Sequence, residues 1–351
     1  MLYLSLCKDK CSEKLNNFAN NKLRCTFAIN QTCHASACKR TRAGFTFSAM
    51  LYSKVPISIS DQINKLSGRG LKIFNISFAE EKLKHISYYR LRAYTYPFQD
   101  NTNANHPFIF PVTFEEIIDF YEFDRDLRLF TFNAIERIEI ALRSLIVYHY
   151  AMSNGSHWFE NKTLYRNWGF FTNDISNLDK EIDRSDEEFI KHYKNKYSSP
   201  LRPPSWMSLE VATLTTLSKM FQNLSRCPEK KRIAKSLGID ILVLENWMHV
   251  LSNVRNICAH HSRIYNRTLS QSLILPSFTH GNKWIKNMSV DNSKMYAVLC
   301  VVVYLLDRII PANNYRYLIY ELFSKYPGVS PKRLNFPDDW KTETFWQNKG
   351  T

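Results

Sequence analysis

The sequence predicts an all-α protein, and three observations lead to this prediction. Glycine is scarce, with 9 residues among 351. Long stretches contain neither Gly nor Pro, and their apolar residues recur at the three-to-four spacing of a helix face. Hydrophobic residues make up 44% of the chain, which is enough for a sizeable core and argues against wholesale disorder.

The chain is basic, with 47 Lys and Arg against 32 Asp and Glu and a formal net charge of +15. Such an excess favours a polyanionic partner, most often nucleic acid, although charge alone is a weak signal. No signal peptide is evident. The longest apolar run, residues 297–306, ends at Asp307 and is too short to cross a bilayer. We therefore expect a soluble, cytoplasmic protein.

Residues 1–49 differ in composition from the remainder. They hold five of the eight cysteines and show no sustained period. One hypothesis is a small zinc site, although no Cys-x2-Cys pair occurs. Its ligands would be Cys7, Cys11, Cys25, Cys33, His34 and Cys38. We favour two other interpretations, a weakly ordered leader or a natural start at Met50. The remaining cysteines, Cys227, Cys258 and Cys300, are expected to be buried reduced thiols.

Helices are predicted from residue 58 onward. Ser58 or Ser60 can cap the first helix, which Gly68 and Gly70 would end. A second helix is expected to begin at Phe78.

Four tyrosines and two arginines are interleaved within residues 85–98. They could stack on bases and hold phosphates, and the candidates for this role are Tyr89, Arg90 and Arg92. The alternative is a helix with an aromatic core stripe. This stripe would consist of Tyr88, Leu91 and Thr95. We favour the core interpretation.

A longer helical block is expected from Thr113 to about Ala151, and Thr113 with Glu116 fits a capping box. A break near residues 124–126 is expected because one unbroken helix would be unusually long. The apolar stripe of its second part consists of Leu127, Phe130, Ala134, Ile138, Ala141, Leu142 and Leu145.

Charged residues occupy the other faces of this second part. Glu139 and Arg143 lie one turn apart and are expected to pair. We favour a solvated or salt-bridged face, and the alternative is that these charges point into a cleft. The neighbouring charges are Glu136 and Arg137.

The C-terminal half is predicted to contain further helices separated by irregular stretches. Their expected ranges are 178–197, 208–224, 228–237, a helix from Asp240, 291–310 and 315–325. Asp291 is expected to cap the fifth of these. Residues 336–340 form an irregular aromatic tail.

The helix that starts near Asp240 has two distinct faces when its residues are placed at about 100° intervals. The apolar stripe consists of Leu244, Trp247, Leu251, Val254 and Cys258. The opposite polar file consists of His249, Asn253, Asn256 and His260. Arg255 lies at the border and is about 140° from His260 on a regular helix. Either the helix distorts near Ala259, or another element or a second subunit completes a site, and the spacing favours a dimer.

The end of this helix collects cations and imidazoles. Residues 254–267 contain three arginines and two adjacent histidines but no acidic residue. Arg holds phosphate oxygens in a planar fork, and His moves protons near neutral pH. This combination suits a phosphodiester and predicts metal-independent RNA cleavage through attack by the ribose 2′-hydroxyl. The alternative is that His260 and His261 only cap the helix C-terminus, where imidazolium suits the helix dipole.

The order Arg255, Asn256, three residues and His260 resembles the signature of the HEPN superfamily of helical ribonucleases. The longer run 255–267 is similar to the bacterial Abi family of abortive-infection proteins, of the AbiD/AbiF type. Further blocks agree in order, so that the likeness covers roughly residues 54–346. These blocks are residues 62–71, 86–94, 121–128, 134–139, 205–207 and 336–340.

This resemblance implies an all-α, HEPN-like helical bundle with a smaller N-terminal helical region, and phage defence by RNA cleavage. It implies that Arg255 and His260 are the catalytic pair, supported by Asn256, in a site composite across a homodimer. The residues expected to bind RNA or support the site are His261, Arg263, Tyr265, Arg267, Glu139, Arg143, Tyr89, Arg90 and Arg92. Expected partners are RNA, including a small non-coding RNA, and a phage trigger. No metal, cofactor or membrane is expected.

Three regions are expected: a leader over residues 1–49, an N-terminal helical region over 50–112, and a HEPN-like domain over 113–351. Two alternatives to the enzyme remain. One is a non-catalytic RNA-binding or regulatory module, and the other is a phage-protein sensor whose output needs a partner. The intact Arg255, Asn256 and His260 favour the enzyme.

Overall fold

The computed structural model describes residues 51–277, 279 and 284–347. The chain divides into two units, residues 1–56 and 57–351. Within the first unit, residues 51–56 form neither helix nor strand. The zinc hypothesis for the N-terminal cysteines lies outside the described residues. The second unit contains all of the elements discussed below.

Helices account for the regular secondary structure of the described residues, which contain isolated β-bridges but no strand. The predicted all-α class is therefore confirmed. The α-helices are α2 (Ile59–Gly68), α3 (Ile76–Ile86), α4 (Tyr88–Thr95), α5 (Phe114–Asn154), α6 (Trp168–Arg184), α7 (Glu188–Lys196), α8 (Ser205–Ser208), α9 (Leu214–Asn223), α10 (Pro228–Ser236), α11 (Ile241–Ala259), α12 (Met295–Ile309) and α13 (Tyr315–Lys325). Short 3-10 helices cover Tyr96–Phe98, Trp158–Glu160, Lys162–Leu164, Pro331–Leu334 and Trp340–Thr342.

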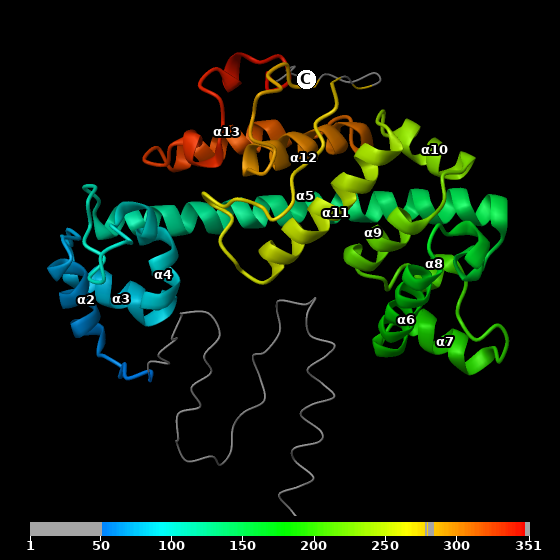
Figure 1. Cartoon of the computed structure of the whole chain (residues 1–351), viewed down its shortest axis with the longest axis horizontal. Helices are drawn as coiled ribbons and strands as arrows, with labels where there is room; N and C mark the ends of the chain where they lie inside the picture. Colours follow the sequence, from blue (N-terminus) through cyan, green and yellow to red (C-terminus); the bar gives the residue numbers. More distant parts are fainter. Residues whose placement is uncertain (1–50, 278, 280–283, 348–351) are drawn as a thin grey trace, which may run out of the picture. The chain divides into compact units, whose positions relative to one another are not determined.

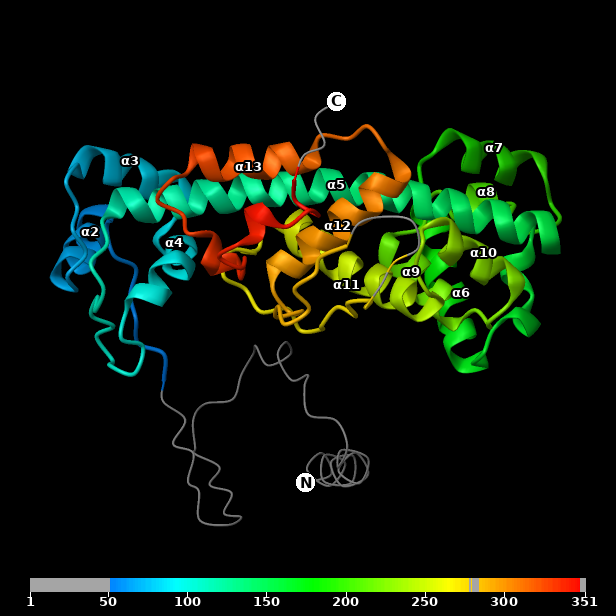
Figure 2. The same ribbon diagram turned by 90° about the horizontal axis from the view of Figure 1, so that it is seen from above.

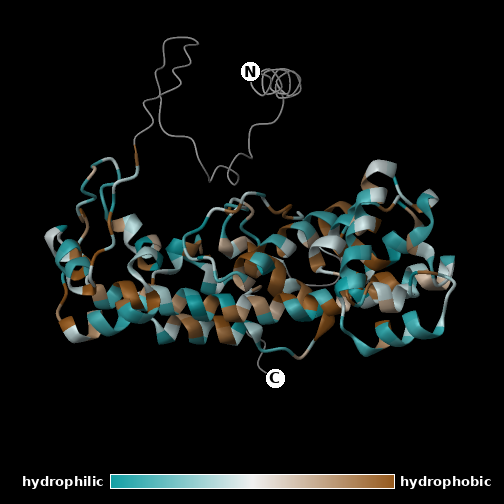
Figure 3. Cartoon of the chain, turned by 90° about the horizontal axis from the view of Figure 1, so that it is seen from below, coloured by the Kyte–Doolittle hydropathy of each residue, from teal (hydrophilic) through white to brown (hydrophobic). Residues whose placement is uncertain are grey.

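The 41-residue helix α5 is the element on which most of the others pack. Figures 1 and 2 show α4 near its start, α12 and α13 along one side, and α11 and α9 on another. Hydrophilic and hydrophobic residues alternate along α5 in Figure 3, as expected for a helix that buries several of its faces. The predicted capping box is confirmed: Thr113 N–H donates to Glu116 at 2.8 Å, and Glu116 N–H donates to the Thr113 hydroxyl at 3.1 Å.

The break expected near residues 124–126 is wrong, because α5 continues through them without interruption. Local propensity does not support a helix of this length, which spans about 60 Å at 1.5 Å per residue. The helix is stabilised instead by tertiary packing along its sides. In place of a break, the Asp124 side chain turns inward and is fully buried.

The Asp124 carboxylate joins three separate parts of the fold. One oxygen accepts from the backbone N–H groups of Ile264 and Tyr265 at 3.0 and 2.6 Å. The other accepts from the Tyr94 hydroxyl at 2.6 Å and pairs with Arg128 one turn later on α5. Burial raises the pKa of this carboxyl, while Arg128 and the hydrogen bonds lower it. The contacts fix α4 and the segment that follows α11 against α5.

Apolar packing covers a further side of α5, which keeps one exposed face. Every residue of α12 from Met295 to Leu306 is buried. The tail packs over α12 and α13 through an aromatic cluster, in which Trp346 Nε1 donates to the Tyr296 hydroxyl at 3.1 Å. Among the described residues, no helix combines the length and the apolar content that a membrane span needs.

Several element boundaries differ from those that the sequence predicts. The charged helix expected over 178–197 is two helices, α6 and α7. The helix expected over 208–224 is also two, α8 and α9. Asp291 does not cap α12; its carboxylate accepts from Ser293 N–H in a turn that precedes the helix. In contrast, the predicted cap at Ser58 and the bounds 315–325 of α13 are confirmed.

We predict that Asp124→Ala lowers the free energy of unfolding by about 3–5 kcal/mol, because Arg128 stays buried without its anion. Two backbone donors also lose their acceptor. The measurement is the urea midpoint. The matched control is Asp119→Ala, an exposed carboxylate on the same helix, which should change stability by no more than about 0.5 kcal/mol. Equal midpoints for the two variants would contradict the role given to Asp124.

Candidate functional site

Helix α11 presents the predicted motif residues and ends among them. Its apolar stripe from Leu244 to Cys258 is buried as predicted. The helix ends at Ala259, and His261 adopts a left-handed conformation with φ of 56°. Ser262 N–H donates to Ile257 O at 2.9 Å and closes this end. The helix stays regular up to this end, since His260 N–H still donates to Asn256 O at 3.0 Å, and the distortion considered near Ala259 is not seen.

Cys258 lies between Arg255 and His260 in sequence but takes no part in reactive chemistry. Its side chain belongs to the buried stripe. Burial raises the pKa of the Cys258 thiol to about 12. Because the thiolate is the reactive form, this residue does not act as a nucleophile at neutral pH.

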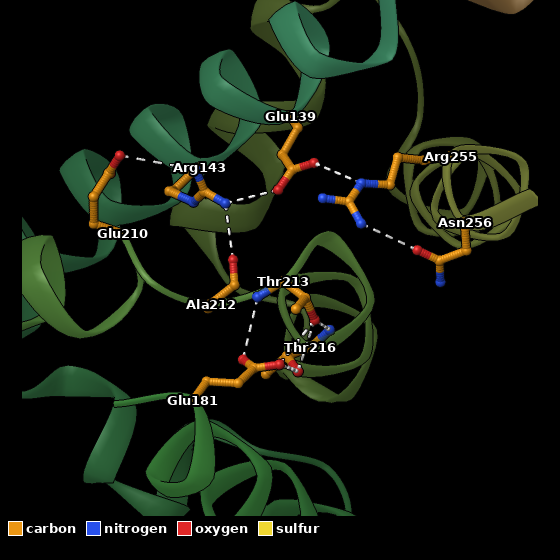
Figure 4. A network of polar contacts seen from close by, with 9 residues as sticks. All are labelled: Glu139, Arg143, Glu181, Glu210, Ala212, Thr213, Thr216, Arg255 and Asn256. Carbon is orange, nitrogen blue, oxygen red and sulfur yellow. Dashed lines mark hydrogen bonds and ion pairs between the residues drawn. The ribbon is translucent and has the colours of Figure 1, made fainter. Parts of the chain in front are cut away.

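The Arg255 guanidinium is oriented by residues from two helices and stays about one third exposed (Figure 4). Its Nε lies 3.9 Å from Glu139 on α5. It donates to the Asn256 side-chain oxygen at 3.3 Å and lies over the Phe132 ring at 5.6 Å. Asn256 in turn donates to the Thr215 hydroxyl on α9 at 3.2 Å. Arg255 therefore has a defined orientation together with a free edge.

The predicted Glu139–Arg143 pair is confirmed, with a distance of 2.8 Å. The favoured solvated or salt-bridged face agrees with the structure: these two residues are salt-bridged and buried, while Glu136 and Arg137 are exposed. Arg143 also donates to the Ala212 carbonyl at 2.8 Å. One carboxylate thus lies between two arginines where α5, α9 and α11 meet. We call Glu139, Arg143, Arg255 and Asn256 the Glu139 network.

A second carboxylate holds the start of α9 beside this network (Figure 4). Glu181 on α6 accepts from the Thr213 backbone and hydroxyl at 3.2 and 2.9 Å and from the Thr216 hydroxyl at 3.0 Å. A negative charge is favourable at a helix N-terminus. The contacts fix the first turn of α9, which supplies Thr215. The sequence does not predict the roles of Thr215 and Glu181, because no local motif or spacing indicates that either residue supports the site.

A separate group of the predicted RNA-binding residues meets beyond the end of α11. Arg90 on α4 donates to the His261 carbonyl at 2.8 Å, although 171 residues separate them. Arg263 donates to the Ala93 carbonyl at 2.9 Å. Arg267 donates to the Arg263 carbonyl at 3.2 Å. These backbone contacts gather three guanidinium groups near the histidines.

The other predicted RNA-binding residues have different surroundings. Tyr89 is 81% exposed and free to stack. Arg92 contacts the His106 ring at 3.1 Å. Tyr265 is buried and stacks on Phe120 with centroids 5.7 Å apart. Its ring supports the segment that follows α11, and its predicted role as a residue that binds RNA or supports the site stays a prediction.

His260 is exposed at the end of α11, and its side chain makes no hydrogen bond within the described part of the chain. An exposed imidazole with both ring nitrogens available can exchange a proton with a bound substrate. Across the described residues, no three His, Cys, Asp or Glu side chains are grouped as a metal site would require. The side chains at this site are suited to binding an anion and transferring a proton.

The fold and the site together define an all-helical protein with a basic, imidazole-bearing helix end. The sequence model of the family described as Abi-like protein matches residues 81–266, and the chain belongs to this family. The match extends from α3 through Arg255, Asn256 and His260 to Asn266. No curated protein matches the chain, and no solved structure matches it.

We predict that double-mutant cycles in urea distinguish the two contacts of Glu139. Glu139→Gln with Arg143→Met should give a coupling of about 1.5–3 kcal/mol, as for a buried hydrogen bond between charged groups. Glu139→Gln with Arg255→Met should give less than about 1 kcal/mol, because this contact is longer and partly exposed. The exposed pair Glu122 and Arg125 serves as the control. A larger coupling to Arg255 than to Arg143 would contradict this geometry.

Proposed function

We propose that this protein is a metal-independent endoribonuclease of the HEPN type that acts in abortive-infection defence against phage. The observation that supports this most is that an oriented, partly exposed Arg255 and an exposed His260 both lie at the end of α11, whose apolar face is buried. Family membership supports the defence role, since the family is that of Abi-like proteins. The basic net charge of +15 agrees with an RNA substrate.

In the proposed reaction, neutral His260 takes the proton from a ribose 2′-hydroxyl. The freed oxygen forms a bond to the adjacent phosphorus, and the bond from phosphorus to the 5′-oxygen breaks. Arg255 stabilises the negative charge that develops on the phosphoryl oxygens. A second imidazole, in its protonated form, donates a proton to the leaving oxygen, or a second guanidinium stabilises the negative charge on it until water protonates it. The products are a 2′,3′-cyclic phosphate and a 5′-hydroxyl.

The site is proposed to need two copies of the chain. Arg255 and His260 diverge by about 140° on a regular helix, so one straight helix does not direct both at a single phosphate. A two-fold axis near the end of α11 would bring the Arg255 of one copy beside the His260 of the other. The partner's imidazole, in its protonated form, would then donate a proton to the leaving oxygen.

We predict that the full-length protein cleaves single-stranded RNA in EDTA and leaves DNA of the same sequence intact. Arg255→Ala and His260→Ala should each lower the cleavage rate at least about hundredfold. Asn256→Ala should lower it less, because this side chain acts through Arg255. Gel analysis of end-labelled RNA measures the rates and identifies the cyclic phosphate.

Two matched substitutions control for loss of charge and imidazole away from the site. They are Arg125→Ala on α5 and His192→Ala on α7, both at exposed side chains, and both should retain the wild-type rate. Cleavage that survives both Arg255→Ala and His260→Ala, or that requires a divalent metal, would reject the mechanism. RNA binding without cleavage would favour a non-catalytic RNA-binding module.

We further predict that the two inactive variants complement each other. A mixed dimer of Arg255→Ala and His260→Ala contains one intact Arg–His combination if each site is composite. Mixing the two proteins, with time for subunit exchange, should therefore restore measurable cleavage. A rate in the mixture equal to that of the separate variants would contradict the two-chain arrangement and leave the single-chain mechanism to be tested.

A further inference from the structure

A row of polar side chains follows the junction of α9 and α11, starting beside the Glu139 network. At one end Asn256 donates to Thr215. One turn further along α9 lies Lys219, whose charge lowers the pKa of His249 on α11 after the larger effect of desolvation. His249 precedes Asn256 by seven residues on the same face of α11, about 10.5 Å at 1.5 Å per residue. The two helices thus line one path that leads away from the candidate active site.

Lys219 and His249 of this row also line a cavity of about 590 Å³ between α6, α9 and α11. This volume lies within the range of small-ligand sites, about 300–1,000 Å³. Side-chain amides dominate its lining, including Asn173, Asn177 and Gln222. These three side chains make no hydrogen bond to any described residue. We call this cavity the amide pocket.

Two further side chains give the amide pocket the features of a nucleotide site. The Phe170 ring is 62% exposed at its lining and offers a stacking surface. Lys219 is exposed and forms no ion pair among the described residues, so its ammonium is available to a phosphate.

Asp174 is the most unusual residue of the amide pocket. It is 5% exposed, and its Oδ2 is buried without a hydrogen-bond partner of ordinary geometry in the described structure. Desolvation raises the pKa of the Asp174 carboxyl to about 6, against the lowering effects of Lys219 and Asn223. A buried carboxylate with unused acceptor capacity is costly unless a ligand satisfies it.

We propose that the amide pocket binds a guanine base of the RNA, with Asp174 accepting from the Watson–Crick edge and Phe170 stacking on the ring. This inference rests on the proposed ribonuclease function and adds a base preference to it. At the rise of about 3.4 Å per nucleotide of a stacked strand, the pocket lies about three nucleotides from Asn256.

Guanine is the base whose donors match this carboxylate. Its N1–H and N2 amino group lie side by side and can donate to both oxygens of one carboxylate, in the manner of an Arg fork. Adenine, cytosine and uracil do not present two adjacent donors on that edge. Asn173, Asn177 and Gln222 can meet the remaining polar atoms of the base, and Lys219 can hold its phosphate.

The test compares two RNA probes of about twelve nucleotides, fully 2′-O-methylated so that they cannot be cleaved. One holds a single guanine among adenines, and the other holds inosine, which lacks only the N2 amino group. Fluorescence anisotropy with the full-length protein should give about tenfold tighter binding of the guanine probe. Asp174→Asn should bind both probes equally. Asp183→Asn, an exposed carboxylate on the same helix, should keep the wild-type ratio.

Phe170→Ala should lower the affinity for both probes about tenfold and leave the ratio of the two affinities unchanged, because stacking does not depend on the N2 amino group. An unchanged guanine-to-inosine ratio in a folded Asp174→Asn overturns the pocket assignment while leaving the ribonuclease proposal intact. If Asp174→Asn does not fold, unchanged affinity in both Phe170→Ala and Gln222→Ala overturns it equally. A wild-type protein that neither binds the probes nor cleaves unmodified RNA rejects the proposed function itself.

Discussion

The buried carboxylate of Asp124 is the contact on which the arrangement of the basic residues depends. It satisfies two backbone N–H groups just after the motif and binds α4 through Tyr94. Together with the stacking of Tyr265 on Phe120, it holds the segment from His260 to Tyr265 against α5. Because α4 is tied to the same anion, Arg90 of α4 contacts the His261 carbonyl although the two residues are distant in sequence.

A second carboxylate on the same helix plays the corresponding role for the catalytic candidate. Glu139 is shared between Arg143, whose other bond goes to the Ala212 carbonyl, and Arg255. Arg143 takes the shorter contact, which leaves Arg255 held at 3.9 Å with an exposed edge. A carboxylate engaged by both arginines limits the repulsion between them. The arrangement leaves the Arg255 guanidinium incompletely neutralised, as binding a phosphate requires.

The sequence predicted what depends on local periodicity and capping. The faces of α11, the capping box at Thr113 and the Glu139–Arg143 pair all follow from spacing along one helix. It did not predict the course of α5 through Asp124, since the stability of a long helix comes from elements that pack on it from elsewhere in the chain. For the same reason Thr215, Glu181 and the amide pocket could not be foreseen. Their positions depend on the packing of α6 and α9 against α11, and no periodic pattern records that packing. The burial of Tyr265 also depends on tertiary contacts, because its ring stacks on Phe120 of α5 and no pattern in residues 254–267 predicts that contact.

The continuity of α5 also restricts how such a protein can be switched. Asp124 and Glu139 lie fifteen residues apart on one uninterrupted helix, about 22 Å at 1.5 Å per residue. The helix therefore acts as a rigid rod that keeps the α4 arginines and the Glu139 network at a constant separation. A hinge between these two parts would require melting of a packed helix. In the proposed ribonuclease, regulation would therefore act on parts that α5 does not span, namely the exposed side chains at the end of α11 and the proposed pairing of two chains.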